Sequence, residues 1–385
     1  MPNLTWGTID YYISRLTSPE RNPPLRIDIC NQNLTDNDAI RLADALLHYS
    51  NGSSRCGSKL KMLRLRGNNI TSTGFLAICE AIGGVADDIS ALEELDMGNN
   101  RVVSNIDDFA FAMYLLFSAA PNLKHLDLTG NRIGLSNGGD MKLIGEILSL
   151  NEHYGGGRLE TLNLSDNFLC DRAVIHLAET MMISEFKSLT RLDLSLNYIG
   201  VRGAEALAEV VACNSPLEHL LLRSNSVGDL GAALFASALK TNDTLLELNL
   251  GYNGITSVGM KELRTAVYDT TSLNSLVTSN HTVSILFYGY CADNDDFHYR
   301  GCTKEELKEM DQILRINALP KHYPDLPPIP QLKLAFRLRQ SFDMKYFHHI
   351  DRKHIPEVLR FVSAHVGADK LYYIMKEMPL AVCAS

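Results

Sequence analysis

The strongest constraint on the fold is a short leucine pattern that recurs along the chain. Its first complete copy, residues 60–70, reads L-x-x-L-x-L-x-x-N-x-I. Further copies begin at Leu92, Leu123, Leu159, Leu189, Leu217 and Leu245. Each copy contains one asparagine, and these are Asn68, Asn100, Asn131, Asn167, Asn197, Asn225 and Asn253. Successive asparagines are 28 to 36 residues apart, a period typical of solenoids built from stacked units.

Each unit combines two periodicities. The L-x-L core has the two-residue period of a short strand, and the second half has helical spacing. In one unit Ala204, Leu207, Ala208 and Val211 stand at i, i+3, i+4 and i+7. One strand and one helix per unit predict an α/β solenoid: a horseshoe with a parallel sheet on its concave face and helices on its convex face.

The pattern resembles the ribonuclease-inhibitor-like leucine-rich-repeat family, which includes the repeat regions of NOD-like receptors and of the Ran GTPase-activating protein. The resemblance covers roughly residues 23–285. It implies a leucine-rich-repeat solenoid. It implies a protein-binding surface too, although the partner stays open because members of the family bind unrelated proteins.

We divide the chain into three parts. Residues 1–22 should form an N-terminal helical cap, since Ile9, Tyr12, Ile13 and Leu16 make one apolar stripe. Residues 23–285 should hold about nine repeats, with imperfect copies at residues 27–34 and 273–282. Residues 286–385 should form a C-terminal helical cap with a proline-rich linker near 319–330. The linker contains a basic residue followed by P-x-x-P (321–327), so it is either a spacer or a recognition motif.

Irregular spacing and recurring residues add detail to the repeats. Insertions are expected around 50–54, 104–117 and 134–140, and such insertions often lie on a binding edge. The repeated asparagines should pair backbone groups where the chain leaves each strand. Gly74, Gly203, Gly231 and Gly259 recur just before the helix that the pattern predicts in each unit. We expect these glycines to allow a tight turn before the helix.

Composition and charge limit the function classes. The chain has 45% hydrophobic and 21% charged residues, which is typical of a folded soluble protein. Neither a secretory leader nor a long apolar run is evident, so we expect a location in the cytoplasm or nucleus and no membrane binding.

The eight cysteines form no C-x-x-C pair, and we expect free thiols. The net charge is -9, with the excess of carboxylates in residues 1–299, which argues against general nucleic-acid binding.

The residues that alternate with the strand leucines should point to the concave face. One column is Asp28, Arg64, Asp96, Asp127, Asn163, Asp193, Leu221, Asn249 and Val277. The column beside it is Met62, Glu94, His125, Thr161, Arg191, His219 and Glu247. From these we select as partner-binding residues Arg64, Glu94, Asp96, His125, Asp127, Asn163, Arg191, Asp193, His219 and Asn249. The acidic centre favours a partner with a basic patch. The alternative is a solvated sheet face without a ligand.

Motifs for catalysis are weak, and we predict that the protein is not an enzyme and has no cofactor. The sequence lacks both the phosphate-loop and the H-E-x-x-H patterns. Residues 134–138 match G-x-S-x-G, but the serine lies inside an insertion and not at a strand end. Two groups of His, Cys and Asp, at 291–302 and 348–354, lack the spacing of a familiar metal site, so no metal is predicted.

The leading hypothesis is therefore a scaffold or recognition module that holds a protein partner on the concave face. Two alternatives follow from the resemblance. One is a GTPase-activating regulator like the Ran protein, although residues 300–385 carry more Lys and Arg than Asp and Glu, unlike the acidic tail of that protein. The other is an innate-sensing or signalling adaptor like the NOD-like receptor repeats. The oligomeric state stays open.

Overall fold

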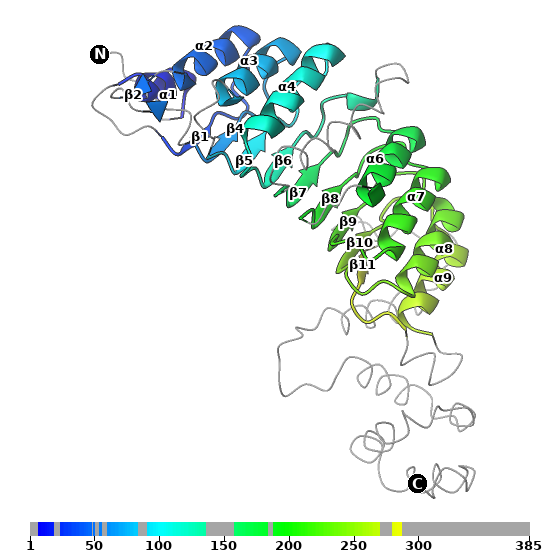
Figure 1. Cartoon of the computed structure of the whole chain (residues 1–385). Coiled ribbons are helices and arrows are strands. Elements are labelled where there is room, and N and C mark those ends of the chain that lie inside the picture. The colour runs from blue at the N-terminus through cyan, green and yellow to red at the C-terminus, as the bar shows by residue number, and fades with distance from the viewer. Residues whose placement is uncertain are drawn as a thin grey trace, which may run out of the picture.

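The computed structural model describes residues 7–18, 24–47, 49–50, 54–55, 60–83, 91–135, 158–183, 188–269 and 279–286. Its main feature is a nine-stranded parallel sheet in which each strand pairs with the next one along the repeat array (Figure 1). The strands are β1 (Arg26–Asp28), β4 (Met62–Arg64), β5 (Glu94–Asp96), β6 (His125–Asp127), β7 (Thr161–Asn163), β8 (Arg191–Asp193), β9 (His219–Leu221), β10 (Glu247–Asn249) and β11 (Ser284–Leu286). This architecture confirms the predicted α/β solenoid.

The leucine at the centre of each strand explains why the units stack. In every strand the middle residue is at most 1% exposed, and these residues are Ile27, Leu63, Leu95, Leu126, Leu162, Leu192, Leu220, Leu248 and Ile285. They lie in register across the sheet. Each buried side chain contributes up to about 1.5–3 kcal/mol of transfer free energy. A single unit would leave this face in water, so the units are stable only as a stack.

Helices cover the other side of the sheet and form the outer side of the curve in Figure 1. They are α2 (Asp36–Leu46), α3 (Ser72–Gly83), α4 (Ile106–Ala119), α6 (Asp171–Ile183), α7 (Val201–Ala212), α8 (Gly228–Leu239) and α9 (Ser257–Val267). A 3-10 turn, η2, spans Ile133–Leu135. The face predicted for α7 is confirmed, because Ala204, Leu207, Ala208 and Val211 are all buried.

The N-terminal segment and two of the expected insertions have defined structure. Helix α1 (Ile9–Leu16) packs its apolar stripe on the core: its first and last residues are buried, while Tyr12 and Ile13 are partly buried. The irregular stretch near residue 50 is an antiparallel hairpin of β2 (Tyr49–Ser50) and β3 (Ser54–Arg55). The insertion at 104–117 lengthens a helix, since α4 has 14 residues. Most of the insertion at 134–140 lies outside the described residues.

The repeated asparagines, which we call the asparagine ladder, join successive units. All seven side chains are at most 8% exposed. The amide nitrogen of Asn197 donates to the carbonyl of Leu164 in the preceding unit and to that of Leu194 in its own. Its oxygen accepts from the amides of Asn167 and Leu169 in the preceding unit. The remaining ladder asparagines bond in the same way, so the side chains pair backbone groups that the short strands leave unbonded.

The repeated glycines serve a different purpose from the one predicted. They lie inside the first turns of α3, α7, α8 and α9 and not before them, and their φ angles are not positive. Instead, the amides of Gly74 and Gly259 donate to Asp36 and Asp229 of the preceding helix, at 3.2 and 3.0 Å. A Cβ atom on Gly259 would lie 2.7 Å from the Asp229 carboxylate and 3.0 Å from Ala232. The prediction of a tight turn was wrong: these glycines let adjacent helices approach.

The last strand is not where the sequence pattern put it. We expected the column to end at Val277, but β11 is Ser284–Leu286, and Leu286 is the residue in register with Asn249. Val277 itself lies outside the described residues. Asn280 precedes this strand and bonds to the carbonyls of Leu239 and Asn242. Asn280 therefore joins the segment before β11 to the turn between α8 and β10. The pattern placed the last repeat too early because Leu273 and Leu276, followed by Ser279 and Asn280, resemble the repeat motif. The C-terminal cap, the proline-rich linker and both His, Cys and Asp groups lie outside the described residues.

Candidate protein-binding surface

The strand register aligns the candidate residues in two columns on one face of the sheet. The first strand position carries Arg26, Met62, Glu94, His125, Thr161, Arg191, His219, Glu247 and Ser284. The third carries Asp28, Arg64, Asp96, Asp127, Asn163, Asp193, Leu221, Asn249 and Leu286. All ten residues selected from the sequence thus stand on the strands, beside the buried central leucines. Strands in a parallel sheet lie about 4.8 Å apart, so each column is a closely spaced row.

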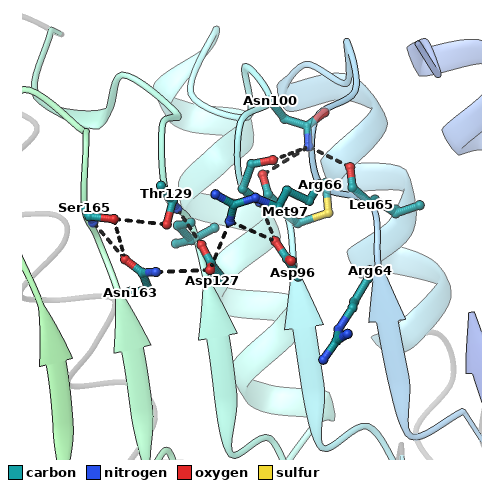
Figure 2. A network of polar contacts seen from close by, with 12 residues as sticks. Arg64, Leu65, Arg66, Asp96, Met97, Asn100, Asp127, Thr129, Asn163 and Ser165 are labelled. Carbon is teal, nitrogen blue, oxygen red and sulfur yellow. Dashed lines mark hydrogen bonds and ion pairs between the residues drawn. The ribbon is translucent and has the colours of Figure 1, made fainter. Parts of the chain in front are cut away.

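Arginines neutralise much of the acidic centre of this face. The Arg64 Nε atom lies 2.6 Å from the Glu94 carboxylate. Arg66, which follows the strand, reaches across the sheet, and its guanidinium lies 3.3 Å from Asp127 and 4.0 Å from Asp96 (Figure 2). The acidic stripe predicted between β4 and β6 is therefore already paired within the molecule.

The third-position side chains also cap the ends of their strands. Asp96, Asp127, Asn163, Asp193 and Asn249 each accept a hydrogen bond from the backbone amide two residues further on, at 2.8–3.1 Å. This is an Asx turn, which fixes the side chain against its own backbone. Figure 2 shows two contacts between neighbouring turns: the Asn163 amide nitrogen donates to the Asp127 carboxylate at 3.1 Å, and the hydroxyls of Thr129 and Ser165, which follow β6 and β7, lie 3.2 Å apart. The row is thus structural as well as exposed, and its geometry is set before any partner binds.

The electrostatic environment differs along the row. Burial is the main cause that raises the pKa of Asp96 above its ordinary value, and the neighbouring Asp127 charge adds to it. The amide of Gly98 and the nearby arginines oppose the shift but do not cancel it. The Asp96 side chain is only 15% exposed, so its carboxylate is a poor first contact for an incoming basic side chain.

A second charged group lies between β8 and β10. The Glu247 carboxylate lies 2.8 Å from the His219 Nδ1 atom and 3.5 Å from the Arg191 guanidinium. Asp193, in the third position of β8, accepts only the amide of Ser195. In the part of the chain that the structure describes, no cationic side chain pairs with Asp193. Its carboxylate is therefore not neutralised by any cation of the described residues.

Sequence reasoning missed a third column. The residue after the last leucine of each core continues the two-residue alternation beyond the strand, and it reads Cys30, Arg66, Gly98, Thr129, Ser165, Ser195, Arg223 and Gly251. Arg66 and Arg223 are its two cations. The guanidinium of Arg223 lies 4.9 Å from the centre of the Tyr252 ring. Extending the alternation by one step would have found both arginines.

The described residues offer neither a metal centre nor a membrane-spanning helix. Among the described residues, no group of three or more His, Cys, Asp or Glu side chains is arranged to hold a metal ion. Of the helices that the structure describes, none has the length and apolar character needed to cross a bilayer. The serine of the G-x-S-x-G match, Ser136, lies outside the described ranges.

Comparison with known proteins agrees with the repeat assignment. Five segments match the family model described as leucine-rich repeat: residues 58–79, 119–136, 187–208, 213–236 and 241–263. No curated protein matches the sequence. These segments fall on units whose strands the structure defines independently.

Three solved structures share limited similarity. Leiomodin-1 actin-binding site 2 is 16% identical, covers 51% of this chain and 95% of its own, and has a TM-score of 0.34. The tropomodulin C-terminal domain of Caenorhabditis elegans is 14% identical, with 45% and 93% covered and a TM-score of 0.34. An internalin of Listeria monocytogenes is 15% identical, with 62% and 84% covered and a TM-score of 0.20.

Because these scores and identities are low, the fold assignment rests on the strand register and the matched repeats. Both lead to one conclusion: the described part of the chain is a leucine-rich-repeat solenoid.

Proposed function

We propose that the protein is an interaction module that holds a protein partner on the sheet face of the solenoid. The observation that carries this proposal is the row of side chains held in register along nine strands, in which five polar residues are also fixed by Asx turns. A preordered surface loses little conformational entropy on binding, which favours affinity for a protein partner.

Within this face, the region from β7 to β9 is the best candidate for the centre of recognition. Between β1 and β6 the carboxylates already pair with Arg64 and Arg66. Asp193, by contrast, lies between Asn163 and Leu221 in register, and neither neighbour competes for its charge. A Lys or Arg of the partner could pair with Asp193 while an apolar group contacts Leu221. The basic patch proposed on the partner should therefore contact the part of the row from β7 to β9.

The test compares single charge reversals. We would capture partners from a cell extract with the wild-type chain, with Asp193→Arg and with Asp243→Arg, and quantify them by mass spectrometry. Asp243 is exposed on the helix-to-strand side, so its reversal changes net charge equally without touching the sheet face. We expect a specific protein to be lost with Asp193→Arg and kept with Asp243→Arg. Equal capture by all three chains would contradict the proposal.

Two finer assignments accompany this proposal. We propose that the repeats are of the ribonuclease-inhibitor type, since the described helices α2 to α9 each have 11 to 14 residues. We also propose that α1 caps the first unit, because it packs on α2 and its Asp10 lies 2.7 Å from Arg41. Nothing in the described residues favours the GTPase-activating or innate-sensing alternatives.

A further inference from the structure

Exposed apolar side chains gather at one edge of the solenoid. Of the ten large hydrophobic residues that are exposed in the described structure, five lie between residues 196 and 258. They are Leu196, Tyr198, Leu230, Tyr252 and Val258, which are 53, 62, 71, 38 and 63% exposed. All five lie in the loops that leave β8 to β10 or in the first turns of the following helices. We call this group the apolar edge. Clustered exposed apolar side chains are typical of interaction surfaces.

The backbone ladder continues into these loops and sets their spacing. The Leu196 amide donates to the Arg223 carbonyl at 2.7 Å, and the Ser224 amide donates to the Gly251 carbonyl at 2.8 Å. Leu196 and Tyr252 therefore occupy equivalent positions two units apart, or about 10 Å. Tyr198 extends the edge toward β7, where its ring centre lies 5.8 Å from that of Phe168. The edge borders the sheet face but shares no residue with the two columns.

Backbone conformation makes this edge unusual among the repeats. The position of Leu196 and Tyr252 is left-handed in eight successive units, with φ between +53° and +71°. In the first five units it holds residues that tolerate this conformation: Asn31, Gly67, Asn99, Gly130 and Asp166. Leucine and tyrosine adopt it at a cost in free energy. The turn requires the left-handed backbone but not an apolar side chain, and these two side chains are exposed and do not belong to the core.

Unpaired arginines border the apolar edge. Arg202 directly precedes Gly203, the same place that Leu230 and Val258 hold before their glycines. Arg223 lies over the Tyr252 ring, and its Nε atom is buried without a hydrogen-bond partner. Within the described ranges, neither arginine has an ion-pair partner, whereas Asp229 is already engaged by Thr256. These arginines place positive charge beside the apolar edge in the units of β8 and β9, while the exposed Asp166, whose amide donates to the Ser195 carbonyl, places a carboxylate at its β7 end.

From these observations we infer that the apolar edge binds a protein segment in which aromatic or aliphatic side chains alternate with Asp or Glu. The apolar side chains of the segment pack on Leu196, Tyr198 and Tyr252. Its carboxylates pair with Arg202 and Arg223. This partner chemistry is opposite in charge to that proposed for Asp193, so the two surfaces bind different segments.

The test uses a displayed library of random short peptides, selected in parallel on the full wild-type chain and on the double variant Leu196→Asn/Tyr252→Asn. Asn31 and Asn99 show that asparagine fits this position in the same protein, so the variant should fold with equal or greater stability. The control is Phe111→Gln, which removes a 50% exposed aromatic ring from α4.

We expect the wild type and the control to enrich acidic peptides with apolar residues, and the double variant not to. A synthetic peptide of the enriched sequence should bind the double variant at least tenfold more weakly, about 1.4 kcal/mol. Arg202→Glu should weaken binding of the peptide as well. Because Glu near a helix N-terminus favours folding, this loss would not be caused by unfolding. Identical selections on wild type and double variant, or enrichment of basic peptides, would overturn the inference. The inference would also be overturned if the double variant kept peptide binding and lost only self-association, measured by ultracentrifugation, or only binding to anionic vesicles. The edge would then bind a second copy of the chain or a lipid surface.

Discussion

Replacing one member of the asparagine ladder should destabilise the protein far more than replacing its exposed neighbours. The side chain of Asn197 makes five hydrogen bonds. In Asn197→Ala the carbonyl of Ser195 keeps a partner, because it also accepts from Asp166. The amides of Asn167 and Leu169 lose theirs. Each unsatisfied buried amide costs about 1–3 kcal/mol, so the loss should be about 2–6 kcal/mol.

The assay is urea unfolding followed by circular dichroism, with thermal unfolding as a second measurement. For a domain of this size each kcal/mol lowers Tm by about 2–4 °C. The control is Asn69→Ala, since Asn69 is exposed and its side chain makes no hydrogen bond among the described residues. The control should stay within about 0.5 kcal/mol of wild type. If Asn197→Ala were equally mild, the ladder would not be the joint between units that its geometry implies.

Three further predictions follow from the packing and the pKa shifts. Gly259→Val should lower the free energy of unfolding by about 1–3 kcal/mol in urea titrations, because its Cβ would crowd Asp229 and Ile255. Burial acts to raise the pKa of Asp229, but the hydrogen bonds it accepts from the following repeat prevail and lower it. Asp229 therefore stabilises the fold above the ordinary carboxyl pKa, and this contribution disappears as the pH falls through the lowered value. Asp229→Asn should thus be destabilising at neutral pH and less so in acid. Native alkylation read by mass spectrometry should label the exposed Cys213 and spare Cys79, whose burial raises its thiol pKa.

The sequence predicted the strand columns because two rules agreed. The leucine spacing fixed which residues are buried, and the two-residue alternation then fixed which ones share the opposite face. Residues such as Asp96 and Asp193 were placed in their columns for that reason. The same rules could not predict the ion pairs of Arg66, since these depend on the reach of a long side chain across two strands.

The errors have physical causes too. Gly74 and Gly259 recur with the repeat, but periodicity alone cannot distinguish a turn from a close contact between helices. Val277 was chosen because a short leucine pair imitated the core motif, whereas the residue in that column is Leu286 of β11, nine residues later. The apolar edge was missed because the left-handed conformation of Leu196 and Tyr252 is dictated by neighbouring units and not by their own preferences.

The asparagine ladder has a direction, and this has a consequence for synthesis. Each ladder oxygen accepts from the unit that precedes it, as Asn225 does from the Ile199 amide and Asn253 from the Val227 amide. During translation, a newly made unit therefore keeps unbonded amides until the next asparagine has left the ribosome, 28 residues later in this part of the chain. Folding should follow synthesis with a lag of one repeat, and only the most recent unit would need protection from wrong contacts at any moment.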